Sequence, residues 1–195
     1  MYTIMNHVKI INHLVFQMKV VFLDVDGVLN TEECQDVPEQ GKEGSEDFIY
    51  DKSTIIPLLK RCLDNLESIL RETGAKVVVT STWRLFPDML AFLTSTLSPM
   101  GTEVIVGLTK GRSSPIGPGR GEEVRQWLQE NGACTKFVIL DDEHKESFES
   151  RLFGRKRPPH GSEGLLVMTR MRGGDFSEQG LNQKNVLEIV QFFNA

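Results

Sequence analysis

Short apolar runs alternate with segments of helical periodicity along most of the chain. Runs of four or five mostly apolar residues, rich in Val, Ile, Leu and Phe, are typical of strands buried on both faces. The predicted strands are residues 19–23, 76–80, 103–106, 136–140 and 165–168. Between them, apolar residues recur three and four positions apart, which indicates amphipathic helices. The predicted helices are residues 54–73, 87–97, 121–131 and 183–193.

Residues suited to helix ends support two of these helices. Gly74 is placed to end the first helix, because glycine adopts the left-handed conformation that such ends need. Asn182 is expected to cap the last helix, with Leu181 and Val186 in position for a hydrophobic staple.

The alternation predicts an α/β fold: a doubly wound, Rossmann-like parallel five-stranded sheet with helices on both faces. Residues 31–52 are expected to form an acidic loop, and the Gly-, Pro- and Ser-rich residues 107–121 a second loop. The first of these loops is too short to hold a large additional domain that would cap the sheet. We divide the chain into an N-terminal extension of uncertain role, residues 1–18, and one α/β domain, residues 19–195.

Composition limits the partners and the cellular compartment expected for the protein. The chain has 195 residues and a formal net charge of -5, which gives no overall attraction to nucleic acid. Its three cysteines lack CxxC spacing, so a reducing, cytoplasmic environment is expected; Cys62 is assigned to the core, and Cys34 and Cys134 to loops. The first 18 residues lack the apolar core and cleavage site of a signal peptide and are too short to cross a membrane, so no membrane partner is expected.

Polar side chains follow three of the predicted strands at their carboxyl ends. In a doubly wound sheet these ends meet in one crevice, where ligands bind. The first strand is followed by two carboxylates and Gly27, which allows a sharp turn. The converging residues are Asp24, Asp26, Thr80, Ser81, Asp141 and Asp142.

Four carboxylates and a hydroxyl, with no nearby His or Cys pair, favour a hard divalent cation, and Mg²⁺ prefers such oxygen ligands. An aspartate can also act as a nucleophile toward phosphorus. A second aspartate two residues along the chain lies within reach of the leaving group and can act as a general acid and base. An Asx-type turn is the alternative interpretation of Asp24 and Asp26.

These motifs resemble those of the haloacid dehalogenase-like (HAD) hydrolase superfamily over residues 19–193. The first motif matches residues 24–28, the second residues 76–81 and the fourth residues 138–142. Residues 81–84 and 120–128 resemble most the branch with a minimal cap, which is related to the phosphatase-type domains of RNA-repair proteins.

The resemblance implies a Mg²⁺-dependent phosphatase that works through an aspartyl-phosphate. Asp24 would be the nucleophile and a metal ligand. Asp26 would be the general acid and base, with its backbone carbonyl on the metal. Asp142 or Asp141 would complete the metal site, and we favour Asp142. The presence of Asp26 favours phosphatase activity, because members without this second aspartate tend to catalyse other reactions.

The phosphoryl group would be bound by the remaining motif residues. Thr80 would donate to its oxygens, together with the backbone of Ser81. The third motif requires a basic residue before the fourth strand; Arg120 fits this position best, and Lys110 is the alternative.

Three further residues are candidate substrate contacts. Arg84 could bind a substrate phosphate with Trp83 as a stacking wall, or the two could simply be a surface arginine and an aromatic residue at a helix start. Asn30 could touch substrate or serve only as a turn residue.

The substrate is expected to be a phosphorylated molecule whose identity the sequence leaves open, as it does the oligomeric state. One alternative function is a nucleic-acid end-processing phosphatase, in which the basic residues 151–160 would bind the backbone; a solvated loop is the simpler interpretation of that run. A different class is a non-catalytic binding module with the same fold, which the intact motifs disfavour.

Overall fold

The structure is a computed structural model that describes residues 17–35, 45–50, 56–111, 119–154, 157–173 and 175–195. Five parallel strands form one sheet in the order β5-β4-β1-β6-β7. The strands are β1 (Met18–Leu23), β4 (Lys76–Val79), β5 (Ile105–Leu108), β6 (Cys134–Asp141) and β7 (Glu163–Met168). The predicted doubly wound parallel sheet is confirmed.

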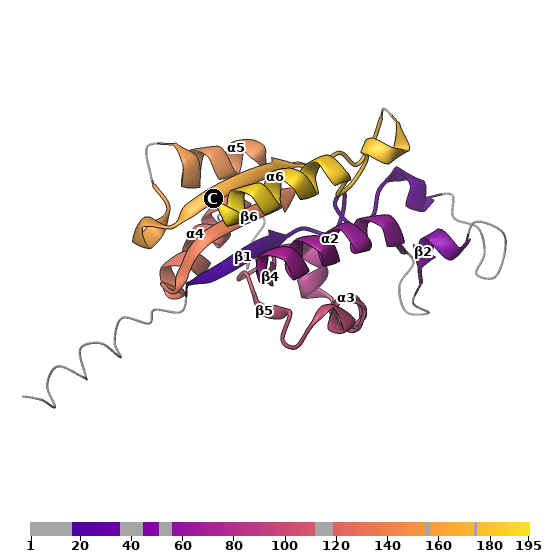
Figure 1. The fold of residues 1–195 in the computed structure, drawn as a ribbon, viewed down its shortest axis with the longest axis horizontal. Coiled ribbons are helices and arrows are strands. Elements are labelled where there is room, and N and C mark those ends of the chain that lie inside the picture. Colours follow the sequence, from indigo (N-terminus) through magenta and orange to yellow (C-terminus); the bar gives the residue numbers. More distant parts are fainter. Residues whose placement is uncertain (1–16, 36–44, 51–55, 112–118, 155–156, 174) are drawn as a thin grey trace, which may run out of the picture.

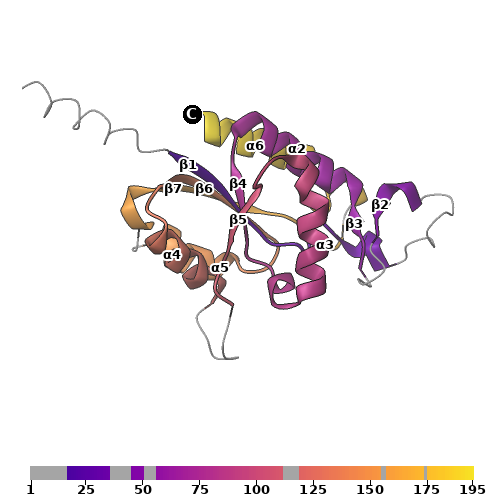
Figure 2. The ribbon, with the colours of Figure 1, turned by 90° about the horizontal axis from the view of Figure 1, so that it is seen from below.

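Helices cover both faces of the sheet (Figures 1 and 2). One face carries α2 (Lys60–Thr73), α3 (Pro87–Leu97) and α6 (Gln183–Asn194), and the other carries α4 (Arg120–Glu130) and α5 (Lys145–Phe148). Strand β1 supplies both cores by alternation: Val21 and Leu23 join the first hydrophobic cluster, and Val20 and Phe22 the second. Burial on both faces explains why the strands are continuous apolar runs.

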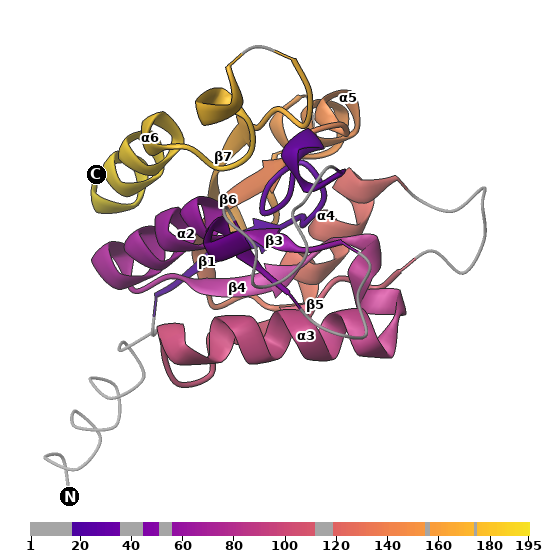
Figure 3. The same ribbon diagram turned by 90° about the vertical axis from the view of Figure 1, so that its right-hand side faces the viewer.

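The carboxyl ends of the strands lie at one edge of the sheet, the end that faces the viewer in Figure 3. The backbone ladder continues one residue past several strands. Asp24 N–H donates to the Leu140 carbonyl at 3.0 Å, and Thr80 N–H donates to the Leu23 carbonyl at 2.8 Å. The positions of the residues after these strands are therefore set by sheet register.

The first predicted helix begins later than expected. Residues 54–55 lie outside the described residues, and α2 starts at Lys60. Leu58–Leu59 form strand β3, which pairs antiparallel with β2 (Phe48–Ile49). The Leu59 N–H also donates to the Leu29 carbonyl at 2.8 Å. These strand contacts hold residues 58–59 extended, so the helical periodicity across them was misleading.

The expected loop over residues 31–52 also contains β2 and two 3-10 turns, Glu32–Gln35 and Ser45–Asp47; residues 36–44 and 51–52 lie outside the described residues. The third strand is Ile105–Leu108 rather than residues 103–106, because Glu103 has φ +52° and belongs to the preceding turn. Cys34 and Cys134 were wrongly assigned to loops. Cys34 is buried in a 3-10 turn, and Cys134 is the buried first residue of β6.

The predicted helix ends are confirmed. Gly74 has φ +68°, and its N–H donates to the Leu70 carbonyl. The Asn182 side chain accepts from the Asn185 N–H at 3.2 Å and so caps α6. Residues 1–16 of the expected extension lie outside the described residues. Among the helices that the structure describes, none has the length and apolar character needed to cross a membrane.

Candidate active site

Three carboxyl groups meet at the carboxyl ends of the adjacent strands β1 and β6. Asp24 follows β1, Asp141 is the last residue of β6, and Asp142 comes next. One ligand oxygen from each lies within 4.8 Å of the other two. The Asp24 N–H donates to the Leu140 carbonyl, and Asp141 pairs with Met168 of β7, so the sheet sets the positions of these two, while Asp142 lies in the bend that follows β6.

Burial, together with neighbouring negative charge, raises the pKa of two of these acids. Burial raises the pKa of Asp24 above its usual 3.8, with Arg120 acting in the opposite direction and the charge of Asp141 adding to the rise. Burial also raises the pKa of Asp142 to about 7, and the neighbouring charges of Asp24, Glu143 and Asp141 act in the same direction. A bound cation would offset both the cost of burying these charges and their mutual repulsion.

Arg120 lies inside this cluster, whereas Lys110 does not. Arg120 is the first residue of α4 and is 8% exposed, and its Nη1 is 3.0 Å from Asp24 Oδ2 and 3.5 Å from Asp141 Oδ2. Lys110 is exposed and pairs with Glu130 at 2.6 Å. Of the two basic residues weighed in the sequence, the geometry therefore favours Arg120 for binding a phosphoryl group beside Asp24.

Two buried oxygens at the site have no hydrogen-bond partner within the described residues: Asp141 Oδ2 and Thr80 Oγ1. The other oxygen of Asp141 accepts from the backbone N–H groups of Glu143 and His144, both at 2.9 Å. Buried polar atoms are usually paired, so these two indicate a place for a missing partner. An all-oxygen donor set of three carboxylates fits Mg²⁺, and the Thr80 hydroxyl is free to donate to a phosphoryl oxygen.

Asp26 is held by two donors, neither of them a cation. Trp83 Nε1 lies 3.1 Å from each of its carboxylate oxygens, and Asn30 Nδ2 lies 3.0 Å from Oδ1. The Asn30 side-chain oxygen accepts from the Gly27 N–H at 3.2 Å, which closes the turn between the two residues. Gly27 has φ +73°, and a Cβ there would lie 2.2 Å from Asp142 Cγ. The turn therefore needs glycine for both backbone conformation and space.

Three candidate substrate contacts have largely buried side chains that bind other protein groups. Asn30 is 1% exposed and orients Asp26, so it does more than complete a turn. Trp83 is 2% exposed and stacks on Phe92, so its ring is not available as an outer wall. The Arg84 side chain is 4% exposed and is paired with Glu123 at 2.7 Å. The interpretations of Trp83 and Arg84 as surface residues or direct phosphate contacts do not fit this burial.

Ser81 and Glu123 complete the surroundings of Asp24. The Ser81 side chain accepts from the Trp83 N–H at 3.3 Å, and its hydrogen bond to Asp24 favours the ionised carboxylate. Glu123 was not among the residues selected from the sequence. Its only sequence signal is its position three residues after Arg120, on the same face of α4.

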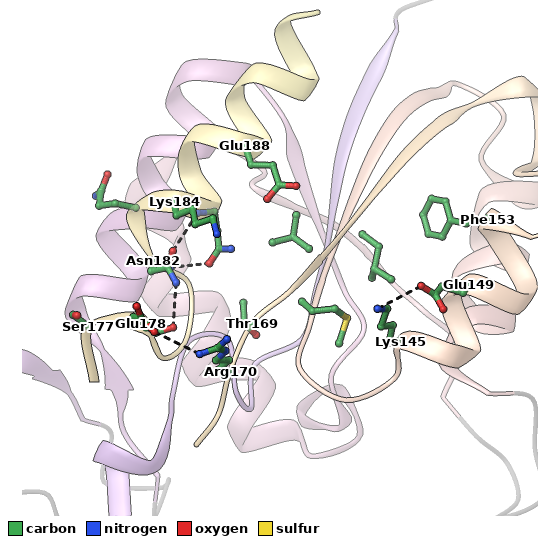
Figure 4. Close-up of a pocket in the computed structure, with 15 residues that line it drawn as sticks. Lys145, Glu149, Phe153, Thr169, Arg170, Ser177, Glu178, Asn182, Lys184 and Glu188 are labelled. Atoms are coloured by element: carbon green, nitrogen blue, oxygen red, sulfur yellow. Dashed lines mark hydrogen bonds and ion pairs between the residues drawn. The ribbon is translucent and has the colours of Figure 1, made fainter. Parts of the chain in front are cut away.

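Two cavities lie near this edge of the sheet. One of about 280 Å³ opens beside Asp26 and is lined in part by Thr31, Ile56 and Met171. A larger one of about 740 Å³ lies between α5, β7 and α6 and includes Thr169 and Arg170 (Figure 4). The three clustered carboxylates line neither cavity, and the smaller cavity includes Asp26 and Asn30 in its lining.

Comparisons with known proteins agree with the fold and the motifs. A family model described as the HAD domain in Swiss Army Knife RNA repair proteins matches residues 20–166. The structure is similar to the HAD domain of the effector protein Lem4 from Legionella pneumophila, solved as an inactive mutant. That likeness has a TM-score of 0.51 at 16% identity and covers 91% of this chain and 97% of the other. Among curated proteins, no sequence matches this chain.

Proposed function

We propose that this chain, which belongs to the family of HAD domains in Swiss Army Knife RNA repair proteins, is a Mg²⁺-dependent phosphomonoesterase. One observation carries the proposal: Asp24 is paired with Arg120 at 3.0 Å and lies within 4.8 Å of two further carboxylates. This arrangement supports the proposal, because it brings together a carboxylate able to attack phosphorus, a guanidinium able to neutralise phosphoryl charge, and candidate metal ligands. Phosphate-monoester hydrolysis is slow without catalysis, and positioning and charge neutralisation supply most of its acceleration.

The reaction proceeds in two displacements. An Asp24 oxygen attacks phosphorus and forms an acyl phosphate as the bond to the leaving oxygen breaks, and the carboxyl group of Asp26 gives its proton to that oxygen. Asp26, now ionised, then takes a proton from water as that water attacks phosphorus. The bond between phosphorus and Asp24 breaks, phosphate leaves, and Asp24 and Asp26 return to their starting states.

The other site residues bind and orient the reacting groups. Arg120 neutralises charge on the phosphoryl oxygens, and the Thr80 hydroxyl donates to one of them. The Asn30 amide and the Trp83 indole point Asp26 toward the leaving oxygen. Mg²⁺ would be held by Asp24, Asp142 and Asp141, with the Asp26 carbonyl as a further ligand, and would supply a Lewis acid for the phosphoryl oxygens.

The test is hydrolysis of an aryl phosphate by the wild-type protein with Mg²⁺, with EDTA, and by Asp24→Asn. We expect turnover that requires Mg²⁺ and is lost both in EDTA and in the variant. The neutral amide of the variant cannot attack phosphorus, and it offers no negative charge to the cation. Persistent turnover by Asp24→Asn would contradict the aspartyl mechanism. A folded wild-type protein that neither turns over aryl phosphates nor binds Mg²⁺ would favour a non-catalytic module.

A narrower candidate function is removal of phosphate from nucleic-acid ends, which the description of the family supports. Arg155 and Lys156 of the basic run lie outside the described residues. If the basic run binds the nucleic-acid backbone, charge reversal at residues 155–157 should weaken oligonucleotide binding and reduce its dependence on salt. A 3′-phosphorylated oligonucleotide should also exceed the aryl phosphate in kcat/KM. Equal binding by the charge-reversed variant would remove this candidate.

A further inference from the structure

One buried side chain links three segments that surround Asp24. The Arg84 Nε donates to the Thr109 carbonyl at 2.9 Å, and Nη1 donates to the carbonyls of Thr80, at 2.5 Å, and Ser81. Nη2 pairs with Glu123 Oε2 at 2.7 Å. The guanidinium thus joins the ends of β4 and β5 to the first turns of α4.

Two of these segments carry groups that the proposed function requires. Thr80 and Ser81 form the turn after β4 that faces Asp24, and Thr80 holds one of the unpaired buried oxygens. Glu123 lies three residues after Arg120, so the two side chains project from the same face of α4. A shift of Glu123 would therefore be passed on to Arg120 through one turn of helix.

The pair itself does not reach a substrate. The Arg84 and Glu123 side chains are both 4% exposed, and neither lines the cavity beside Asp26 or the larger one near β7. A buried ion pair adds little net stability, because desolvation offsets the attraction. What the guanidinium does provide is a planar fork of donors that fixes several acceptors at once.

We propose that Arg84 and Glu123 form a clamp that sets the positions of Arg120 and of the Thr80–Ser81 turn relative to Asp24. They are positioning residues for the phosphoryl group, and this proposal rests on the phosphatase function proposed above. Misplacement of well-oriented groups by about 1 Å can reduce rates about 100-fold, so a fold-preserving change in the clamp should be visible in turnover.

The variants Arg84→Lys and Glu123→Gln test the clamp with aryl phosphate and Mg²⁺. Lysine keeps the charge but lacks the fork, and glutamine keeps an acceptor oxygen but lacks the charge. The matched control is Glu130→Gln, which removes an exposed ion pair with Lys110 at the far end of the same helix. Turnover is compared with inhibition by orthovanadate, whose inhibition constant does not depend on the fraction of folded enzyme.

We expect Arg84→Lys to lower kcat about 10- to 100-fold, to leave KM within about threefold, and to weaken orthovanadate inhibition in step with kcat/KM. Glu123→Gln should behave similarly but more mildly, and Glu130→Gln should match the wild type. In an Arg120→Lys background, Glu123→Gln should lower kcat by a smaller factor than it does in the wild type, because Glu123 acts through Arg120.

Three results would overturn the clamp while leaving the phosphatase function intact. The first is a fall in kcat with an unchanged orthovanadate constant, which means only a loss of folded protein. The second is a rise in KM at constant kcat, which means direct ground-state binding by Arg84. The third is an undiminished loss from Glu123→Gln in the Arg120→Lys background. An inactive but folded wild type would instead overturn the phosphatase function, and the clamp with it.

Discussion

Asp142→Asn should stabilise the metal-free protein at pH 8 while abolishing its stabilisation by Mg²⁺. In the folded protein the pKa of Asp142 is raised from 3.8 to about 7, first by burial and then by the charges of Asp24, Glu143 and Asp141. The folded state therefore binds this proton more tightly than the unfolded chain does. Between about pH 4 and pH 7 the free energy of unfolding falls as pH rises, and above pH 7 the full penalty is present. Asparagine carries no charge and escapes that penalty.

The size of the effect follows from the pKa. Each tenfold change in proton affinity is worth about 1.4 kcal/mol, so a rise from 3.8 to about 7 corresponds to at most about 4 kcal/mol. Asp142 is only half-buried, and solvent screening reduces this figure. We expect about 1 to 2 kcal/mol, which raises the Tm of a chain of this length by about 2 to 8 °C.

The assay is thermal unfolding in EDTA and in excess Mg²⁺, at pH 4.5 and pH 8. The variant should unfold at a higher temperature than the wild type only in EDTA at pH 8, and Mg²⁺ should raise the Tm of the wild type alone. Asp64→Asn, which changes an exposed acid on α2, is the control and should follow the wild type throughout. A variant no more stable than the wild type in EDTA at pH 8, or a Tm difference between the two proteins in EDTA that is the same at pH 4.5 and pH 8, would refute the reasoning.

Two substitutions in the turn after β1 and its surroundings have defined outcomes. Gly27→Ala places a Cβ 2.2 Å from Asp142 Cγ at φ +73°, so Mg²⁺-dependent Tm shifts and turnover should both be lost; preserved Mg²⁺ binding would contradict this. Trp83→Phe removes the 3.1 Å donor to Asp26 while keeping most of the buried ring, so kcat should fall about 10-fold with far-ultraviolet circular dichroism unchanged. Equal kcat in the two proteins would show that the indole N–H does not orient Asp26.

The fold was predictable because its elements are strongly patterned. The strands are buried on both faces, so each appears as a continuous apolar run, and Asn182 and Gly74 mark helix ends by their own chemistry. The errors fall where tertiary contacts override local pattern. Leu58 and Leu59 fit a helical period, yet both pair with β2, and the Leu59 N–H donates to the Leu29 carbonyl. No local property of the two leucines indicates that choice.

In the candidate site too, some positions could be predicted from the sequence and others depend on tertiary contacts. Asp24, Thr80 and Asp141 could be placed together from the sequence, because parallel strands carry their carboxyl ends to one edge. The contacts of Arg84 could not be predicted, because its partner Glu123 comes 39 residues later and its other acceptors are backbone carbonyls. Side chains that follow a strand are placed by topology, whereas those that brace such residues depend on packing that a linear pattern does not contain.

The negative charge of the cluster should couple the binding of the cation to the binding of the substrate. Three carboxylates lie within 4.8 Å of one another, and the ion pairs that the described residues form with them come from Arg120. A phosphate monoester that entered this group alone would bring its own negative charge into an already repulsive, largely buried space. A divalent cation offsets that repulsion, so its binding should make substrate binding more favourable. By linkage, substrate should tighten cation binding by the same factor. Arg120 and the cation both offset the negative charge of the cluster, so removing either of them should weaken the binding of substrate.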